Sequence, residues 1–176
     1  DKARRYVDYL RDRRIHFDMN TSFDLFVNGL DANAERMYAK MLVRPILRDA
    51  EAGLPEHTVK LSAYASMELL DAVEADWRSW DHELQYIRSG DKFIDVQHPG
   101  ASKGFALEKL AGLRGVEREQ VLAIGNYYND IGMLSFAGLG VAMGNAPADV
   151  QAAADEVAPS NEEEGCAVML NQLGIA

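Results

Sequence analysis

Cysteine and long apolar runs are both scarce in this sequence of 176 residues. Its single cysteine, Cys166, excludes an intramolecular disulfide and any zinc site built on clustered cysteines. The apolar runs all fall short of the roughly 20 residues that cross a bilayer, and the charged residues 1–5 do not resemble a signal peptide. We therefore expect a soluble protein of a reducing, cytoplasmic compartment, with no membrane partner.

Positive charge is also scarce, above all in the C-terminal third. The net charge of the chain is −10, and residues 115–176 carry one basic side chain against nine acidic ones. Residues 1–14 carry six basic and three acidic side chains, a mixture typical of one solvated helix face. An acidic chain without a basic stripe is a poor partner for nucleic acid or for an anionic membrane surface.

Apolar residues in the first half of the chain show two alternating kinds of spacing. Helical spacing alternates there with short runs in which every second residue is apolar, which predicts an α+β unit with an antiparallel sheet. We expect helices at 3–10, 31–42 and 66–80, strands at 15–19, 23–27 and 59–63, and a hairpin over 84–96. The first domain is assigned to residues 1–90.

Residues 91–176 follow a different rhythm. Val121–Gly125 is a continuous apolar run, typical of a strand that is covered on both faces of a parallel sheet, and helical segments surround it. The last of these is expected to be capped by Asn161 and to run to about Leu173. About three strands can be recognised here, whereas a sheet typically has about five. We therefore expect an α/β layer with a parallel sheet, part of which is absent from this chain.

Polar side chains follow the buried strand. Asn126, Asn129 and Asp130 lie in a strand-to-helix loop, at the carboxyl end of a strand, where open α/β sheets bind ligands. Their oxygens suit a hard cation such as Mg²⁺, although a loop in which Asn129 or Asp130 only caps the next helix explains them equally well. Lys103 begins another helix, whose N-terminus favours anions. A lysine in that position is usually just solvated, but beside a metal site it supplies what phosphoryl transfer needs.

These motifs together resemble the haloacid dehalogenase (HAD) superfamily. The matching stretches are, in order, Gly100–Gly104, Ala123–Asp130, Gly138–Ala146 and Ser160–Gly165. The last two are similar to the Cof-type subclass (class IIB). The resemblance is close over residues 91–176 and looser over residues 1–90, which fit the cap that this subclass inserts into its core. It implies a Rossmann-like core, here its C-terminal half, with an α+β cap whose Phe26, Asn28 and Tyr38 are candidates for contacts with the leaving group.

The resemblance also implies an activity and a set of site residues. The reaction is Mg²⁺-dependent hydrolysis of a small phosphorylated metabolite, such as a sugar phosphate or a phosphorylated cofactor, through a phospho-aspartate. Lys103 would steady the nucleophile and the transferring phosphoryl group. Asn126 and Asp130 would serve the metal site, and Asn129 and Asn161 would border the phosphate or ligand.

Two features depart from the family pattern. The Asp-x-Asp-Gly-Thr motif that supplies the family's nucleophile and general acid–base is not in this sequence. We therefore expect the chain to be the C-terminal piece of a longer phosphatase and to be inactive alone, because electrostatic help without a nucleophile cannot form the phospho-enzyme. Asn126 stands where the family usually has a metal-binding aspartate, and the loss of one negative charge lowers the affinity for a dication.

Two alternatives stay open. A non-catalytic binding or regulatory protein on the same scaffold would keep these loops and lose the chemistry, and Asn126 slightly favours it. A truncated remnant would expose a strand edge and apolar surface, which favours aggregation or a homo-oligomer.

Overall fold

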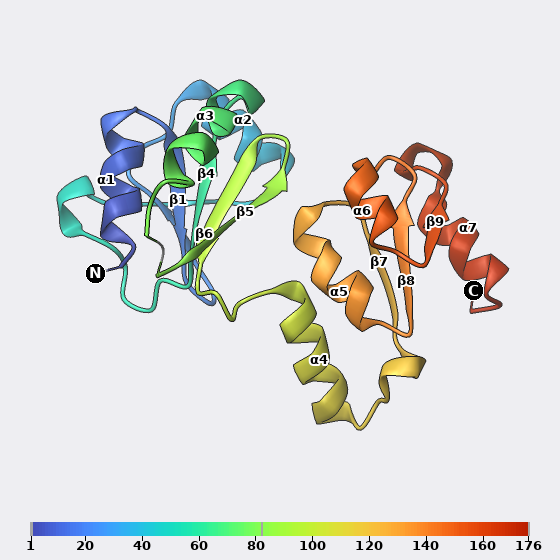
Figure 1. Ribbon diagram of the computed structural model, residues 1–176. Coiled ribbons are helices and arrows are strands. Elements are labelled where there is room, and N and C mark those ends of the chain that lie inside the picture. The colour runs from blue at the N-terminus through green and yellow to red at the C-terminus, as the bar shows by residue number, and fades with distance from the viewer. Residues whose placement is uncertain (1, 82, 176) are drawn as a thin grey trace. The chain divides into compact units, whose positions relative to one another are not determined.

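The computed structural model describes residues 2–81 and 83–175. Contacts divide the chain into two compact units, Asp1–Pro99 and Gly100–Ala176, drawn in blue to yellow-green and in yellow to red in Figure 1. The domain boundary expected at residues 90 and 91 falls inside a hairpin of the first unit. The second strand of that hairpin pairs with two strands of the first unit, so this unit extends beyond the expected boundary.

In its described residues, the first unit has one sheet and three α-helices. The helices are α1 (Arg4–Asp12), α2 (Ala32–Lys40) and α3 (Met67–Trp77), and the strands are β1 (His16–Asn20), β2 (Leu25–Val27), β3 (Ile46–Leu47), β4 (Lys60–Tyr64), β5 (Gln85–Gly90) and β6 (Phe93–Gln97). The strand order is β3-β2-β1-β4-β6-β5. The pairs are antiparallel as predicted, except β2 with β3. The sequence did not reveal β3, because a two-residue strand has no alternation to detect.

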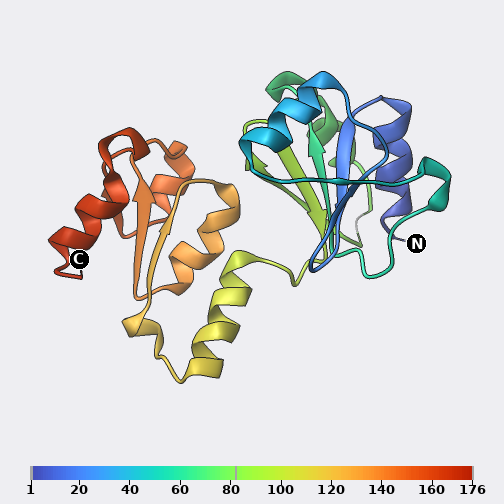
Figure 2. The ribbon, with the colours of Figure 1, turned by 180° about the vertical axis from the view of Figure 1, so that it is seen from behind.

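The two faces of this sheet are covered differently. Phe17 and Met19 of β1 join the apolar core that α1 and α3 complete. His16 and Asp18, one residue out of phase, point to the opposite face, where Tyr38 of α2 lies. The two views agree, since α3 lies in front of the sheet in Figure 1 and α2 in front of it in Figure 2.

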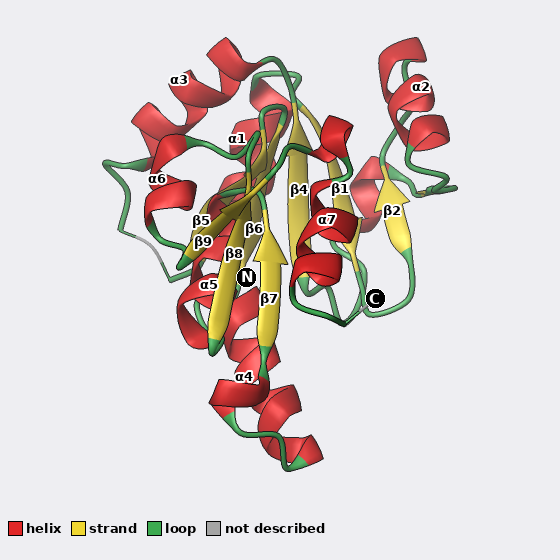
Figure 3. Cartoon of the chain, turned by 90° about the vertical axis from the view of Figure 1, so that its right-hand side faces the viewer, coloured by secondary structure: helices red, strands yellow, loops and turns green. Residues whose placement is uncertain are grey.

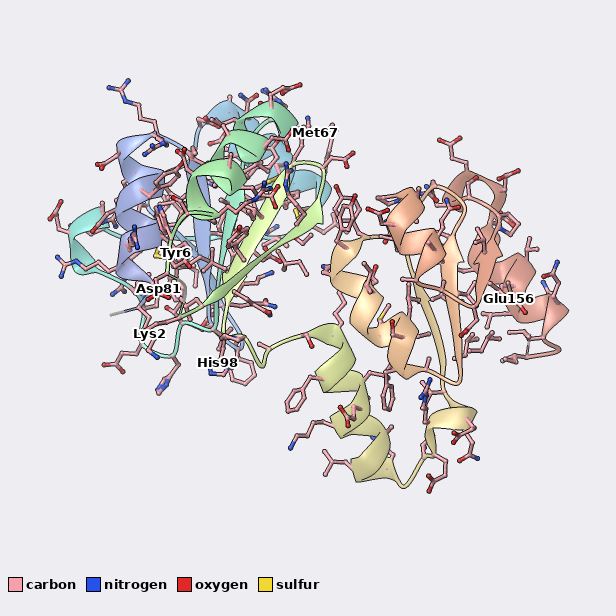
Figure 4. The ribbon with its side chains drawn as sticks, in the orientation of Figure 1. Lys2, Tyr6, Met67, Asp81, His98 and Glu156 are labelled. Atoms are coloured by element: carbon pink, nitrogen blue, oxygen red, sulfur yellow. The ribbon has the colours of Figure 1, made fainter. Side chains whose placement is uncertain are left out.

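Aromatic rings fill much of the core of the first unit. Trp77 is fully buried, and its ring meets Tyr6 of α1 edge-on, with centroids 4.9 Å apart; Figure 4 labels Tyr6 on that helix. The helix α3 ends at Trp77 and does not continue to Trp80 as expected. Ser79 donates a hydrogen bond to the Asp76 carbonyl, and the Trp80 N–H bonds back to the Trp77 carbonyl, which closes a tight turn.

The second unit contains the predicted parallel α/β layer. Its helices are α4 (Lys103–Arg114), α5 (Ile131–Phe136), α6 (Ala148–Ala152) and α7 (Gly165–Gln172), and its strands are β7 (Leu122–Gly125), β8 (Leu139–Met143) and β9 (Glu156–Ala158). The strands pair in the order β7-β8-β9 and are all parallel, as Figure 3 shows. Among the described residues, β7 pairs with β8 alone.

The last helix begins later than the sequence suggested. The stretch from Asn161 to Glu163 forms a short 3-10 turn, and Glu164 then adopts a left-handed conformation with φ of 57°. α7 starts only at Gly165, where a Cβ would lie 2.0 Å from the Pro159 carbonyl oxygen. This close passage of two chain segments interrupts the helix and requires glycine at that point.

Candidate active site

The loop that follows β7 is held by the buried side chain of Asp130. Its Oδ2 accepts hydrogen bonds from the backbone N–H of Asn126 at 2.8 Å and of Tyr127 at 3.1 Å. A Cβ on Gly125 would lie 2.5 Å from the Cβ of Asp130, so glycine is needed where the strand ends. The carboxylate thus folds the loop back onto itself.

Helix α4 begins beside this loop. Ser102 caps it, because its Oγ accepts a hydrogen bond from the Phe105 N–H at 3.1 Å. Gly104 crosses Gly132 of α5 so closely that a Cβ on Gly104 would lie 2.5 Å from the Gly132 carbonyl carbon. Two glycines at the crossing therefore bring the first turn of α4, and Lys103 with it, next to the loop after β7.

Lys103 and Asp130 form an ion pair at this junction. Lys103 Nζ donates to Asp130 Oδ1 at 2.5 Å. The lysine side chain is 51% exposed and the aspartate side chain 3%. The ammonium group has three donors and Asp130 uses one of them, so Lys103 can present positive charge to an anion while it stays fixed. The sequence predicted both residues for one site, and the structure brings them together.

The other two residues predicted in this loop lie nearer the surface. Asn126 is exposed and Asn129 is half-buried. Asn126 offers one neutral amide oxygen, whereas both oxygens of Asp130 already accept hydrogen bonds. Since Mg²⁺ is usually held by one or two carboxylates together with water and substrate phosphate, these side chains do not form a magnesium site by themselves. Over residues 2–81 and 83–175, His, Cys, Asp and Glu do not gather in any group of three or more suited to a metal.

The fifth predicted residue, Asn161, lies in a neighbouring loop of the same unit. Its backbone N–H donates to Asn145 Oδ1 at 3.0 Å, so the turns after β8 and β9 are tied together. Gln151 braces the first of these turns by donating to the carbonyls of Gly144 and Ala146. Both loops were predicted from the sequence but Gln151 was not, because nothing local marks a glutamine that reaches back five to seven residues.

The three candidates in the first unit all have partners within that unit. Asn28 accepts a hydrogen bond from Arg11 and donates to the Arg48 carbonyl, and Phe26 packs against the apolar core. Tyr38 is 3% exposed and bonds to two residues of β1. Asp18 of β1 and Asp95 of β6 are buried carboxylates on this sheet, and neither was predicted to be buried. Their signal is a polar residue at the centre of a short apolar strand.

No helix in the described part of the chain combines the length and the apolar character needed to span a bilayer.

Comparison with known proteins gives a consistent result. The sequence model of haloacid dehalogenase-like hydrolases matches residues 1–170. A protein of Haemophilus influenzae is 35% identical over 138 residues, which are 78% of this chain and 51% of that protein. Phosphatase YwpJ of Bacillus subtilis is 38% identical over 105 residues, which are 58% of this chain and 37% of that protein. The chain thus spans about half, or less, of the length of these curated relatives.

Solved structures share the fold. A haloacid dehalogenase-like hydrolase from Bacteroides thetaiotaomicron matches with a TM-score of 0.74 at 28% identity, over 97% of this chain and 65% of that one. The HAD subclass IIB sugar phosphatase BT4131 matches with a TM-score of 0.84 at 21% identity, over 99% of this chain and 66% of that one. These likenesses confirm the predicted combination of an α/β core part with an α+β cap.

Proposed function

The chain belongs to the haloacid dehalogenase-like hydrolases, and we propose that it forms the cap and the C-terminal part of the core of a phosphatase. In this proposal the first unit is the cap and the second unit is the core part. The substrate we propose is a small phosphorylated metabolite, such as a sugar phosphate or a phosphorylated cofactor. The identity to phosphatase YwpJ, which extends over 58% of this chain, supports the reaction class.

The contact between Lys103 and Asp130 carries the proposal. It joins the N-terminal turn of α4 to the loop at the carboxyl end of β7, and it leaves the lysine side chain half-exposed. Transfer of a phosphoryl group spreads negative charge over several oxygens, and a pre-positioned cation stabilises that charge. We assign Lys103 to this role, Asp130 to positioning the lysine and the loop, and Asn129 and Asn161 to the border of the phosphate.

The family implies a magnesium ion, and most of its ligands would have to come from outside this chain. Asn126 can add one neutral oxygen to its coordination, and when bound the ion would polarise the phosphoryl oxygens. The partners of Asp130 in this structure favour a positioning role for it over the ligand role that the sequence suggested.

We further propose that an upstream segment carrying an Asp-x-Asp motif completes the core. Within the described residues, β7 forms an edge of its sheet, and α4 carries large apolar side chains in solvent, with Phe105 at 49% and Leu113 at 84% exposure. An unpaired strand edge and exposed apolar side chains are both costly in a finished domain. An additional strand and helix would cover both features.

The test compares two proteins. The chain alone, mixed with Mg²⁺ and a panel of sugar phosphates and phosphorylated cofactors, is expected to release no phosphate, because it lacks the Asp-x-Asp motif that supplies the family's nucleophile. The same chain extended upstream to the Asp-x-Asp motif is expected to turn over. Turnover by the chain alone would refute the assignment of the nucleophile to another segment.

In the extended protein, Lys103→Ala should lower kcat about 10²- to 10³-fold, the usual cost of losing one electrostatic contact to the transition state. Lys109→Ala is the matched control, because Lys109 lies on the same helix over the Phe105 ring, away from Asp130. Equal effects of the two variants would remove Lys103 from the site.

A second candidate is a non-catalytic binding protein on the same scaffold, which the neutral Asn126 favours. The coding sequence upstream of Asp1 distinguishes the two. A reading frame with no Asp-x-Asp pair would leave only binding of a phosphorylated ligand, measured by calorimetry without turnover.

A further inference from the structure

Three side chains of the first unit form a continuous hydrogen-bonded chain between α2 and β1. The Tyr38 hydroxyl donates to Asp18 Oδ2 at 3.1 Å, and it lies 2.9 Å from His16 Nε2. Tyr38 is 3% exposed and Asp18 is 5% exposed, while His16 is half-buried at the end of the strand. These hydrogen bonds therefore connect a buried carboxylate with a partly solvated imidazole.

The direction of these hydrogen bonds follows from counting protons. A tyrosine hydroxyl has one proton, and here Asp18 accepts it. The oxygen of Tyr38 must then accept from His16, so the imidazole carries its proton on Nε2. The side-chain amide of Asn20 donates through Nδ2 to Asp18 Oδ1 at 2.5 Å, so Asp18 Oδ2 is the oxygen that accepts from Tyr38.

We propose that His16, Tyr38 and Asp18 form a two-way relay, in which uptake of one proton by Asp18 reverses both hydrogen bonds and moves His16 to its Nδ1–H tautomer. The proton binds Asp18 Oδ2, which becomes a donor to the Tyr38 oxygen. The tyrosine proton turns to His16 Nε2. The Nε2 proton leaves to solvent and Nδ1 takes one from solvent, so that the net change is one proton on Asp18.

The groups around Asp18 make this proton uptake accessible near neutral pH. Burial raises the pKa of Asp18 to about 6. The hydrogen bonds from Asn20 and Tyr38 and the charge of Lys60 lower this pKa, and the charge of Asp95 raises it further. Lys60 forms an ion pair with Asp95 at 3.3 Å, so its positive charge is shared between Asp95 and Asp18. Ser62 donates a hydrogen bond to the Asp95 carboxylate. On the other neighbouring strand, β2 places the apolar Val27 opposite Asp18.

The histidine end of the relay is shifted toward its neutral form. Burial lowers the pKa of His16, and the carboxylate of Asp31 opposes this shift. A neutral imidazole has one donor and one acceptor nitrogen, which is what a reversible relay requires. If both His16 and Asp18 were protonated, each would donate to Tyr38, and the tyrosine proton would lose its acceptor within the relay. Strong acid should therefore loosen this contact between α2 and the sheet.

The tautomer of His16 tests the proposal directly. Long-range ¹H–¹⁵N NMR on the whole chain at about pH 8, above the ordinary histidine pKa of about 6.5, should show His16 protonated on Nε2. In Asp18→Asn the carbonyl oxygen stays with Asn20, so the amide NH₂ faces Tyr38 and imitates the protonated acid. We expect the ratio of the two tautomers to shift toward Nδ1–H about tenfold or more, the preference that one buried hydrogen bond sustains.

Two variants separate the relay from a general charge effect. Asp95→Asn removes the other buried carboxylate of this sheet and should leave the His16 tautomer unchanged. Tyr38→Phe cuts the relay, so that adding Asp18→Asn to it should no longer move the tautomer. An Nδ1–H tautomer in the unmodified chain at about pH 8, or equal shifts in the Asp18 and Asp95 variants, would overturn the proposal.

Discussion

Replacing Asp18 by Asn should change the pH dependence of stability in a defined direction. Burial is the main reason that the pKa of Asp18 rises from its ordinary 3.8 to about 6. The folded protein therefore binds this proton more tightly than the unfolded chain does. The stabilisation that comes from protonated Asp18 is complete below the pKa that this residue has in the unfolded chain, and it is lost as the pH rises through about 6.

The size of the effect follows from the shift in pKa. About two units correspond to about 3 kcal/mol, since one unit is 1.36 kcal/mol, and about 2 kcal/mol of this falls between pH 4.5 and pH 7.5. The total stability of a domain is about 5–15 kcal/mol, so the change is measurable. Asp18→Asn cannot titrate, and the difference in unfolding free energy between the two proteins should move by this amount in favour of the variant as the pH rises.

Tryptophan fluorescence is the suitable probe. Both tryptophans of the chain, Trp77 and Trp80, lie in or against the core of the first unit, so urea unfolding followed by fluorescence reports on the unit that contains Asp18. Asp95→Asn serves as the control for removing a buried carboxylate from the same sheet. It removes only the smallest of the causes that act on the Asp18 pKa, so most of the pH dependence should remain in this variant. A difference in unfolding free energy that stays constant across this pH range would refute the assignment of a raised pKa to Asp18.

Four further substitutions test other parts of the structure. Gly104→Ala forces its Cβ against the Gly132 backbone at 2.5 Å and should lower the free energy of unfolding by about 1–3 kcal/mol. Gly112→Ala lies on the same helix with nothing within 4 Å of its Cβ and should raise that free energy by up to about 1 kcal/mol. Urea unfolding followed by far-UV circular dichroism measures both. Leu42→Gly should raise the melting temperature and stabilise by about 1 kcal/mol, because this leucine has φ of 56° and is 92% exposed; an unchanged or lower melting temperature would contradict the strain. Asp130→Asn loses a charged acceptor and should cost about 1–3 kcal/mol and speed hydrogen exchange of the two loop N–H groups that it accepts from, while unchanged exchange would contradict its bracing role.

The candidate site was predicted from the sequence to the extent that its residues lie in local motifs. Lys103 follows a helix cap, and Asp130 ends a polar loop after a buried strand, so both could be placed at element ends before any contact was known. What each oxygen of Asp130 does could not be predicted, because its partners are a side chain 27 residues away and two backbone groups whose direction depends on how the loop folds.

The sequence by itself determined that an α+β part precedes a parallel α/β part, together with most of their elements and the polar loops, because apolar periodicity and turn residues act over a few neighbours. Tertiary structure decided which charges are buried and what they bind. Asp18 and Asp24 both lie next to apolar residues in the sequence, yet Asp18 is 5% exposed and Asp24 is in solvent. Only the pairing of β1 with its neighbours and the packing of α2 over it distinguish them, since burial and pKa depend on contacts between distant parts of the chain.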